Sequence, residues 1–266
     1  VLDIISEAKN LIKQGAKEIC LLGQNVNAFH GEYKKRTMSL EELIMEVADL
    51  SGVERIRYMT SHPVDMTDGL IAAHGKVKKL MPYLHLPVQS GDNNVLKSMN
   101  RKYSVENYLK IIDKLKNARD DMAFSSDFIV GFPGESKQAF KNTLKLVDEV
   151  KYCQAYSFKY SRRPGTPGSI LNGQVSEEIK IERLAELQMI LNEQQLSFNK
   201  KFIGKKFDVL LERRGKKDNQ LVGKSPYMQA VHILTKDYKI GDIVKTQIVN
   251  ADKNSLNGSL YNRCKE

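Results

Sequence analysis

The chain has 266 residues and a mass of 30.2 kDa, with 41% hydrophobic and 28% charged residues, which fits one large or two ordinary globular domains and excludes a disordered chain. It holds no run of about 18 apolar residues, so no membrane-spanning helix is expected, nor any secretory peptide in the chain as given. The net charge is +10, of which residues 201–266 carry +7, with 11 Lys and 3 Arg against 7 acidic residues, and this concentration predicts a polyanionic partner.

Residues 1–160 are predicted to alternate between helices and short buried strands. Because Val1 opens directly into a helical pattern, we expect the chain to start within a domain. Alternation of strands and helices produces parallel βαβ units, which fit either an open doubly wound sheet or a partial barrel. The apolar periodicity and helix caps predict helices near 2–14, 39–50, 65–73, 104–115 and 136–147, and strands at 18–22, 55–59, 83–86, 124–130 and 152–158.

A long helix is predicted to begin after the cap residue Ser176 and to end before Gly204. It links a first domain, residues 1–200, to an all-β domain, residues 201–266, and the linking helix spans 176–203. Five short strands within about 60 residues are typical of a small OB-like barrel. They are expected at 207–211, 220–224, 230–234, 243–249 and 256–260.

Amides, glycines and prolines follow each of the first five predicted strands, at the edge where parallel α/β folds bind their ligands. Carboxamides such as Gln24, Asn25, Asn27 and Gln89 donate and accept at once, which suits an amino acid or a ribose better than a phosphate. GxxxxGK[ST] and GxGxxG are both absent, so no nucleotide-phosphate loop is predicted. Any one segment could be ordinary turn chemistry, but five at one edge favour a ligand site in a common hollow. The segments are 23–27, 60–63, 87–92, 131–135 and 160–166.

Basic residues form two further candidate sites. Arg162 and Arg163 lie in a Pro- and Gly-containing loop, and Arg101 lies in a basic-aromatic cluster, where phosphate recognition and a solvated surface are both open. Cations of the second domain suit single-stranded nucleic acid, with Tyr227 either stacking on a base or packing in the core. These cations are Lys205, Lys206, Arg213, Arg214, Lys216, Lys217 and Lys224.

The cysteines and histidines show no metal-binding pattern. Cys20, Cys153 and Cys264 are too widely spaced for a disulfide framework or a metal motif, which favours a reducing cytoplasm. Cys20 and Cys153 lie in apolar runs and are predicted to be buried, inert thiols. His85 is interpreted as a hydrogen-bonded core histidine, whereas His62 is either a turn residue or a binding residue.

Four segments in this order resemble the radical S-adenosylmethionine methylthiotransferases, and most of all their tRNA-modifying, MiaB-type branch. The resemblance implies an α/β fold, a partial radical-SAM TIM-like barrel without its first strand, followed by a small all-β OB-like TRAM barrel that binds RNA. It covers nearly the whole chain. The segments are 21–29 (LLGQNVNAF), 85–91 (HLPVQSG), 126–135 (SDFIVGFPGE) and 160–167 (YSRRPGTP).

The resemblance also implies an activity. Enzymes of this branch add a methylthio group to C2 of isopentenyl-adenosine beside the anticodon of tRNA, using S-adenosylmethionine and two four-iron four-sulfur clusters. A cytoplasmic monomer bound to the tRNA anticodon stem-loop is therefore expected, with Arg101, Arg162 and Arg163 on the RNA side. The residues implied to contact S-adenosylmethionine are Gly23, Gln24, Asn25, Asn27, Gln89, Ser90, Asp127, Ile129 and Gly131.

The cysteine motif CxxxCxxC, which holds the radical-generating cluster in this family, is absent from the chain. Cys20, Cys153 and Cys264 match no cluster motif, so no metal ligand is predicted. We therefore expect the chain to be a C-terminal portion of such an enzyme, inactive alone. Two alternatives stay open: a non-catalytic RNA-binding remnant, and the ribosomal-protein-modifying branch, whose basic substrate the basic tail would repel.

Overall fold

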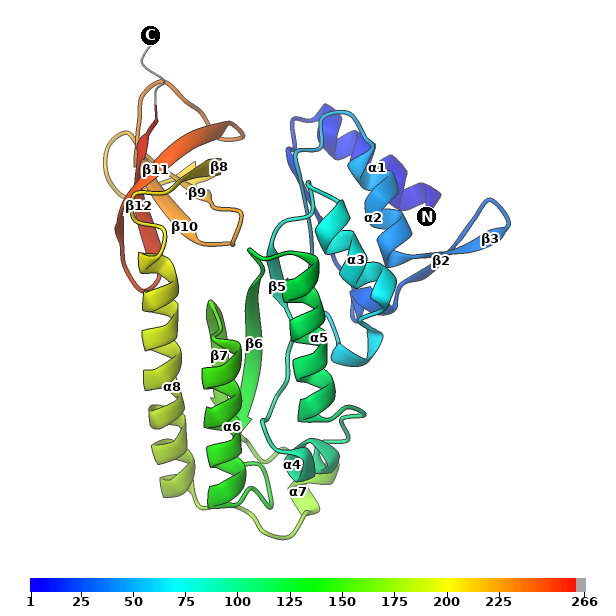
Figure 1. Cartoon of the computed structure of the whole chain (residues 1–266), viewed down its shortest axis with the longest axis vertical. Helices are drawn as coiled ribbons and strands as arrows, with labels where there is room; N and C mark the ends of the chain where they lie inside the picture. Colours follow the sequence, from blue (N-terminus) through cyan, green and yellow to red (C-terminus); the bar gives the residue numbers. More distant parts are fainter. Residues whose placement is uncertain (262–266) are drawn as a thin grey trace.

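The computed structural model describes residues 1–261, in which an arc of parallel strands, a long helix and a closed β-barrel follow one another (Figure 1). Cys264 lies outside the described residues. Within them, no helix combines the length and the apolar character needed to cross a membrane.

Five parallel strands form the arc. β1 pairs with β4, and β6 pairs with both β5 and β7. Between β4 and β5 the ladder narrows to a bridge at Ile56 and Leu80, where the Ile56 amide donates to the Lys79 carbonyl (2.7 Å) and the Met81 amide donates to Ile56 (3.0 Å). The strands are β1 (Glu18–Leu21), β4 (Arg55–Tyr58), β5 (Tyr83–His85), β6 (Ala123–Val130) and β7 (Gln154–Lys159).

The helices cover one face of the arc. Alternate strand residues such as Ile56, Leu84 and Phe128 are fully buried in one core with the helices, whereas His85 and Asp127 point to the opposite side, here called the inner face. One covered face fits a partial barrel and excludes the doubly wound alternative, which has helices on both faces. The helices are α1 (Leu2–Lys13), α2 (Leu40–Ala48), α3 (Asp68–Lys76), α5 (Val105–Ala118) and α6 (Lys137–Val150).

The predicted helix caps are confirmed. The hydroxyls of Ser104 and Ser136 accept hydrogen bonds from the Asn107 and Ala139 amides at 3.2 and 3.0 Å. In the box before α2, the Ser39 amide donates to the Glu42 carboxylate (2.9 Å).

Several short elements were not predicted. The hairpin of β2 (His30–Tyr33) and β3 (Arg36–Ser39) turns through Lys34 and Lys35, both in the left-handed region (φ 49° and 64°), where Asn and Gly are the usual signals. The remaining elements are too short for periodicity to show. They are η1 (Val26–Ala28), η2 (Pro63–Asp65), α4 (Asn93–Ser98) and α7 (Pro167–Ile170).

The last five strands close into a barrel, as predicted, and their order around it is β10-β12-β11-β8-β9. Val209, Val231 and Leu256 are fully buried in its core. Gly223 lies inside β9 because a Cβ atom there would collide with the Leu210 carbonyl. The strands are β8 (Lys206–Arg214), β9 (Gln220–Lys224), β10 (Ala230–Leu234), β11 (Ile243–Ala251) and β12 (Ser255–Leu260).

Helix α8 (Glu177–Lys200) carries the chain from one end of the arc to the other. At its start Glu177 pairs with Lys159 at the carboxyl end of β7 (2.8 Å), and near its end Gln194 accepts from the Tyr152 amide just before β7 (3.1 Å). The β-barrel therefore lies at the amino ends of the strands, opposite the segments that follow them (Figure 1).

Candidate functional site

The segments that follow β1 and β4 are joined through Asn27. Its carboxamide donates to the His62 carbonyl and accepts from the His62 amide, both at 2.8 Å, and only 5% of the residue is exposed. Asn25 reaches across in the same way and donates to Asp65 (2.7 Å). Asn27 therefore fixes two segments to each other, while the neighbouring Gly23 and Gln24 are exposed.

The next segments continue the same rim. The ring of His62 contacts Tyr103 edge-on (centroids 5.5 Å apart), and the Tyr103 hydroxyl donates to the Val88 carbonyl (3.1 Å). Between β5 and β6, the Gln89 amide donates to Asp127 and the Gln89 carbonyl accepts from Ile129, both at 2.9 Å. The second and third segments are thus linked, and the third is bonded to β6, which leads into the fourth.

The last two segments meet through aromatic residues. The Tyr160 amide donates to the Val130 carbonyl (2.8 Å), and the rings of Phe132 and Tyr160 pack at 5.0 Å. All five segments therefore follow one another around the carboxyl ends of the strands.

Three successive strand ends carry a residue in the left-handed region: Thr60 (φ 66°), Gln89 (φ 72°) and Gly131 (φ 71°). For Thr60 and Gln89 this conformation costs on the order of 1–3 kcal/mol, and such strain is typical of ligand sites. Gly131 also packs against the aliphatic chain of Lys180, and its amide donates to the buried Glu135 carboxylate (2.6 Å).

A cavity of about 630 Å³ lies in this rim and opens at the carboxyl ends of β6 and β7. It is large enough for a nucleoside-sized ligand. The half-buried Arg101 borders it, and the Nε of Arg101 is buried without a hydrogen-bond partner in residues 1–261. The lining residues are Ser98, Met99, Asn100, Arg101, Ile129, Phe132, Phe158, Lys159, Tyr160, Ser161, Arg163, Thr166, Pro167 and Gly168.

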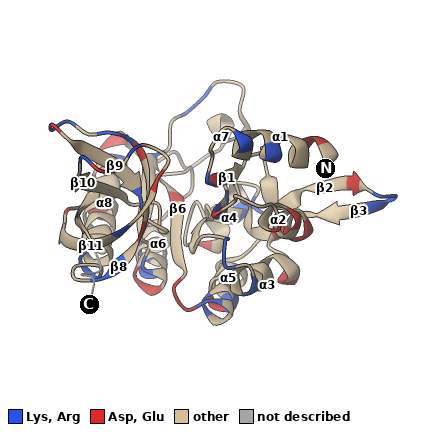
Figure 2. Cartoon of the chain, turned by 90° about the horizontal axis from the view of Figure 1, so that it is seen from above, with Lys and Arg blue, Asp and Glu red and all other residues tan. Residues whose placement is uncertain are grey.

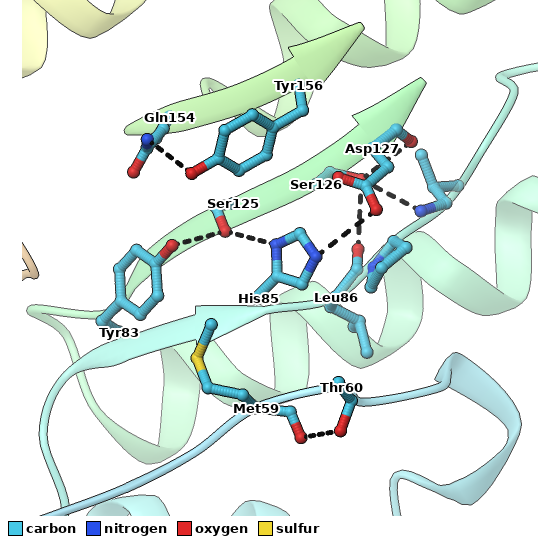
Figure 3. A network of polar contacts seen from close by, with 12 residues as sticks. Met59, Thr60, Tyr83, His85, Leu86, Ser125, Ser126, Asp127, Gln154 and Tyr156 are labelled. Atoms are coloured by element: carbon cyan, nitrogen blue, oxygen red, sulfur yellow. Dashed lines mark hydrogen bonds and ion pairs between the residues drawn. The ribbon is translucent and has the colours of Figure 1, made fainter. Parts of the chain in front are cut away.

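A row of polar side chains crosses the inner face over β5 and β6 (Figure 3). The Tyr83 hydroxyl lies 2.8 Å from Ser125 Oγ, which lies 2.7 Å from His85 Nδ1, and His85 Nε2 lies 3.5 Å from the Asp127 carboxylate. Burial raises the pKa of Tyr83, so its hydroxyl stays protonated. His85 is hydrogen-bonded, as expected, but it lies on the inner face and not in the core.

Two predicted residues are located differently from their expectation. Ser90 is fully buried, with its Oγ accepting from the Asp92 amide (3.3 Å), so its side chain shapes the third segment from within. The prediction that Cys20 is a buried thiol is wrong: Cys20 is exposed, because strand alternation places Ile19 and Leu21 against the helices and Cys20 on the inner face.

The other cysteine is buried as predicted. Cys153 Sγ lies 3.1 Å from the Phe124 carbonyl, and burial raises the pKa of this thiol to about 12, which keeps it protonated. In residues 1–261 no group of three or more His, Cys, Asp or Glu side chains could hold a metal ion.

The basic residues form two sets at opposite ends of the arc. Arg162 and Arg163 are exposed at the rim, and most predicted cations of the β-barrel are exposed. Figure 2 shows Lys and Arg on the strands and loops of the β-barrel. Lys224 is half-buried beside the arc. The exposed cations are Lys205, Lys206, Arg213, Arg214, Lys216 and Lys217.

Of the two roles considered for Tyr227, stacking on a base or packing in the core, the structure shows packing in the core. Its ring packs against Phe202 (4.9 Å) and Phe198 (5.9 Å), and its hydroxyl donates to Asp121 of the α/β part (3.2 Å). A ring held in this way joins the two parts of the chain and does not present a free face to a base.

Sequence reasoning missed the buried Glu135–Arg183 pair (2.6 Å), which ties the fourth segment to α8. It also missed the exposed aromatic residues of β7, Tyr156 and Phe158. The spacing of two residues between Tyr156 and Phe158 in the sequence QAYSFK could have indicated that both rings lie on one face of the strand.

Comparison with known proteins agrees with this geometry. Residues 1–147 match the Radical SAM superfamily, and residues 200–261 match the TRAM domain. The chain is 54% identical over 255 residues to the tRNA-2-methylthio-N(6)-dimethylallyladenosine synthase of Sphingopyxis alaskensis, covering 96% of this chain and 57% of that protein. The synthase of the same name from Wolbachia pipientis subsp. Culex pipiens is 54% identical over 258 residues, covering 96% and 59%.

The chain therefore spans less than three fifths of the length of these curated relatives. Among solved structures, coproporphyrinogen III oxidase from Escherichia coli superposes with a TM-score of 0.56 at 14% identity, over 96% of this chain and 63% of that one. At this identity the likeness concerns the fold alone.

Proposed function

The chain belongs to the Radical SAM superfamily, and we propose that it forms the cofactor-binding arc and the RNA-binding domain of a tRNA methylthiotransferase that modifies C2 of an N6-dimethylallyl-adenosine beside the anticodon. The observation that carries the proposal is the 54% identity over nearly the whole chain, within which the four motif segments form one rim. It supports the MiaB-type resemblance of those motifs.

The residues of the rim fit S-adenosylmethionine. Ile129 and Phe132 offer an apolar wall for the adenine, and the half-buried Asp127 suits the ammonium group. Arg101, with its unpartnered buried Nε, suits the carboxylate, which supports a cofactor contact for this residue in place of the RNA contact first expected. When bound, the cofactor supplies the radical chemistry of the reaction, and the protein orients it and excludes water.

The described residues do not fit an iron–sulfur cluster. Cys20 is exposed on β1, Cys153 is buried before β7, and residues 1–261 contain no grouping that could hold a metal. We therefore propose that activity depends on thiolates beyond the described part of this chain.

A second candidate function is RNA binding without catalysis, which the TRAM match over residues 200–261 favours. Modification of a basic ribosomal protein is less compatible with the +7 charge of residues 201–266.

Binding of S-adenosylhomocysteine to the 266-residue chain, measured by calorimetry, tests the cofactor site. We expect measurable binding and an affinity about tenfold lower in Arg101→Ala, because the variant loses a charge-assisted hydrogen bond. Lys102→Ala is the matched control, since Lys102 is exposed and outside the cavity. RNA binding with no S-adenosylhomocysteine binding would favour the non-catalytic alternative.

A further inference from the structure

Strand β7 exposes two aromatic side chains. Tyr156 is 47% and Phe158 is 55% exposed, and both point to the inner face because they alternate along the strand. The two residues are about 7 Å apart along β7. Within residues 1–261, β7 pairs only with β6, so one of its edges is unpaired.

Polar groups lie directly beside these rings. Asp127 is the register partner of Tyr156, whereas the partner of Phe158 is the apolar Ile129. The His85 ring approaches Tyr156 edge-on, with centroids 6.3 Å apart, and Figure 3 shows Tyr156 next to the polar row. Flat apolar faces with hydrogen-bonding groups at their margin match the chemistry of a nucleobase.

A second cavity, of ≈ 340 Å³, follows the unpaired edge of β7. Besides Tyr156 and Phe158 it is lined by the carboxamides of Gln188 and Asn192 on α8 and by Lys253 from the β11–β12 turn of the β-barrel. Carboxamides both donate to and accept from the edge of a base, and the ammonium group suits a phosphate.

Cations lie at both ends of the strand. Lys253 comes from the β-barrel at the amino end, whereas Arg162 and Arg163 follow the carboxyl end and have no ion-pair partner among the described residues. Lys159 is already paired with Glu177. Aromatic rings in the middle of β7 and cations at both ends suit single-stranded RNA, whose bases stack on flat rings and whose phosphates bind cations.

We propose that β7 is the strand along which single-stranded RNA lies, with Tyr156 and Phe158 stacking on its bases and Lys253 and Arg162–Arg163 holding its phosphates. The inference rests on the proposed tRNA function and specifies which surface of the protein binds the single-stranded anticodon loop. It also assigns the β-barrel a direct part at this surface, through Lys253.

The test uses the 266-residue chain and an anticodon stem-loop RNA with 2-aminopurine in the single-stranded loop. Stacking on an aromatic ring quenches this fluorophore, so the quench reports stacking and the anisotropy reports affinity. We expect Tyr156→Ala and Phe158→Ala each to lose the quench and to weaken binding about tenfold. Tyr156→Phe should retain both, because the ring and not the hydroxyl does the stacking.

Ile181→Ala is the matched control, since Ile181 is 56% exposed on α8 and lines neither cavity. It should bind like the unmodified chain, and thermal unfolding should show all variants folded. S-adenosylhomocysteine affinity should be unchanged in Tyr156→Ala, because Tyr156, unlike Phe158, does not line the cofactor cavity.

Unchanged quench and affinity in both alanine variants would overturn the inference and leave the proposed function standing. An effect on S-adenosylhomocysteine alone would also overturn it, because the rings would then serve the cofactor. Absence of any RNA binding by the unmodified chain would overturn the inference and the proposed function together.

Discussion

His74 shows how one buried side chain makes the stability of the fold depend on pH. It lies in α3 with 1% of its surface exposed, and its Nε2 is 2.7 Å from the Tyr58 hydroxyl of β4. Burial, aided by the charge of Arg119, lowers the pKa of His74 from 6.5 to about 3. Between about pH 6.5 and pH 3, His74 is therefore neutral in the folded protein and protonated in the unfolded chain.

From this we predict that the chain loses stability as the pH falls from 6.5 towards 3, because the unfolded state binds the proton first. The His74 contribution is about 2 kcal/mol between pH 8 and pH 5. Urea unfolding followed by circular dichroism measures it, since the chain has no tryptophan. His74→Gln should make the stability depend less on pH. His232→Gln is the control, because His232 is half-buried on β10, and it should keep the full pH dependence. An equal pH dependence in both variants would contradict the prediction.

At the same scale, the sequence predicted residue types better than residue roles. Asn27 and Gln89 lie at the rim, and their contact with a cofactor stays a prediction. The sequence did not show that the Asn27 carboxamide is already hydrogen-bonded to the backbone of His62, 35 residues away in the chain. The left-handed conformation of Thr60 was equally invisible, because a glycine, which would have signalled it, is not used there.

At the scale of elements, strand β4 joins the two parts of the molecule. Arg55 donates to the backbone carbonyls of Lys224 (2.9 Å) and Asp208 (2.7 Å), and Arg57 donates to Ser225 (3.0 Å). Glu18 of β1 lies 3.1 Å from the Arg57 Nε. Both arginines are buried, so these carbonyls supply hydrogen bonds that the guanidinium groups would otherwise lose on leaving water.

We predict that Arg55→Met costs about 2–4 kcal/mol and lets the β-barrel unfold separately from the arc. Scanning calorimetry should show one transition for the unmodified chain and two for the variant. Arg36→Met is the control, because Arg36 pairs with Glu42 at the surface and is 53% exposed, so its loss should cost at most about 1 kcal/mol. A single transition at an unchanged temperature in Arg55→Met would exclude this role.

Element types were predictable where periodicity is long, and less so elsewhere. The five barrel strands and the caps Ser104 and Ser136 follow from local patterns. The alternating sequence of β4 indicates a strand, but it does not reveal that Arg55 and Arg57 reach partners more than 150 residues away. Such contacts depend on the packing of two domains, which no local pattern encodes.

On the scale of the whole molecule, the rim and the cationic β-barrel lie at opposite ends of the arc, with β7 and α8 running between them (Figure 1). An RNA that reaches both ends must therefore extend along the molecule. The exposed Lys216 and Lys217 in the β8–β9 turn would then contribute to RNA binding through phosphate contacts alone, independently of the cofactor cavity.

We predict that the double variant Lys216→Gln, Lys217→Gln lowers the salt dependence of RNA binding, reducing the steepness of log K against log salt by about 1–2 because two fewer counterions are released. Fluorescence anisotropy across a salt series measures this slope. Lys34→Gln, Lys35→Gln, in the turn of the β2–β3 hairpin, removes the same charge elsewhere and should leave the slope unchanged. Because both pairs alter the net charge equally, an equal effect would mean that total charge, and not the location of the β-barrel cations, governs RNA binding.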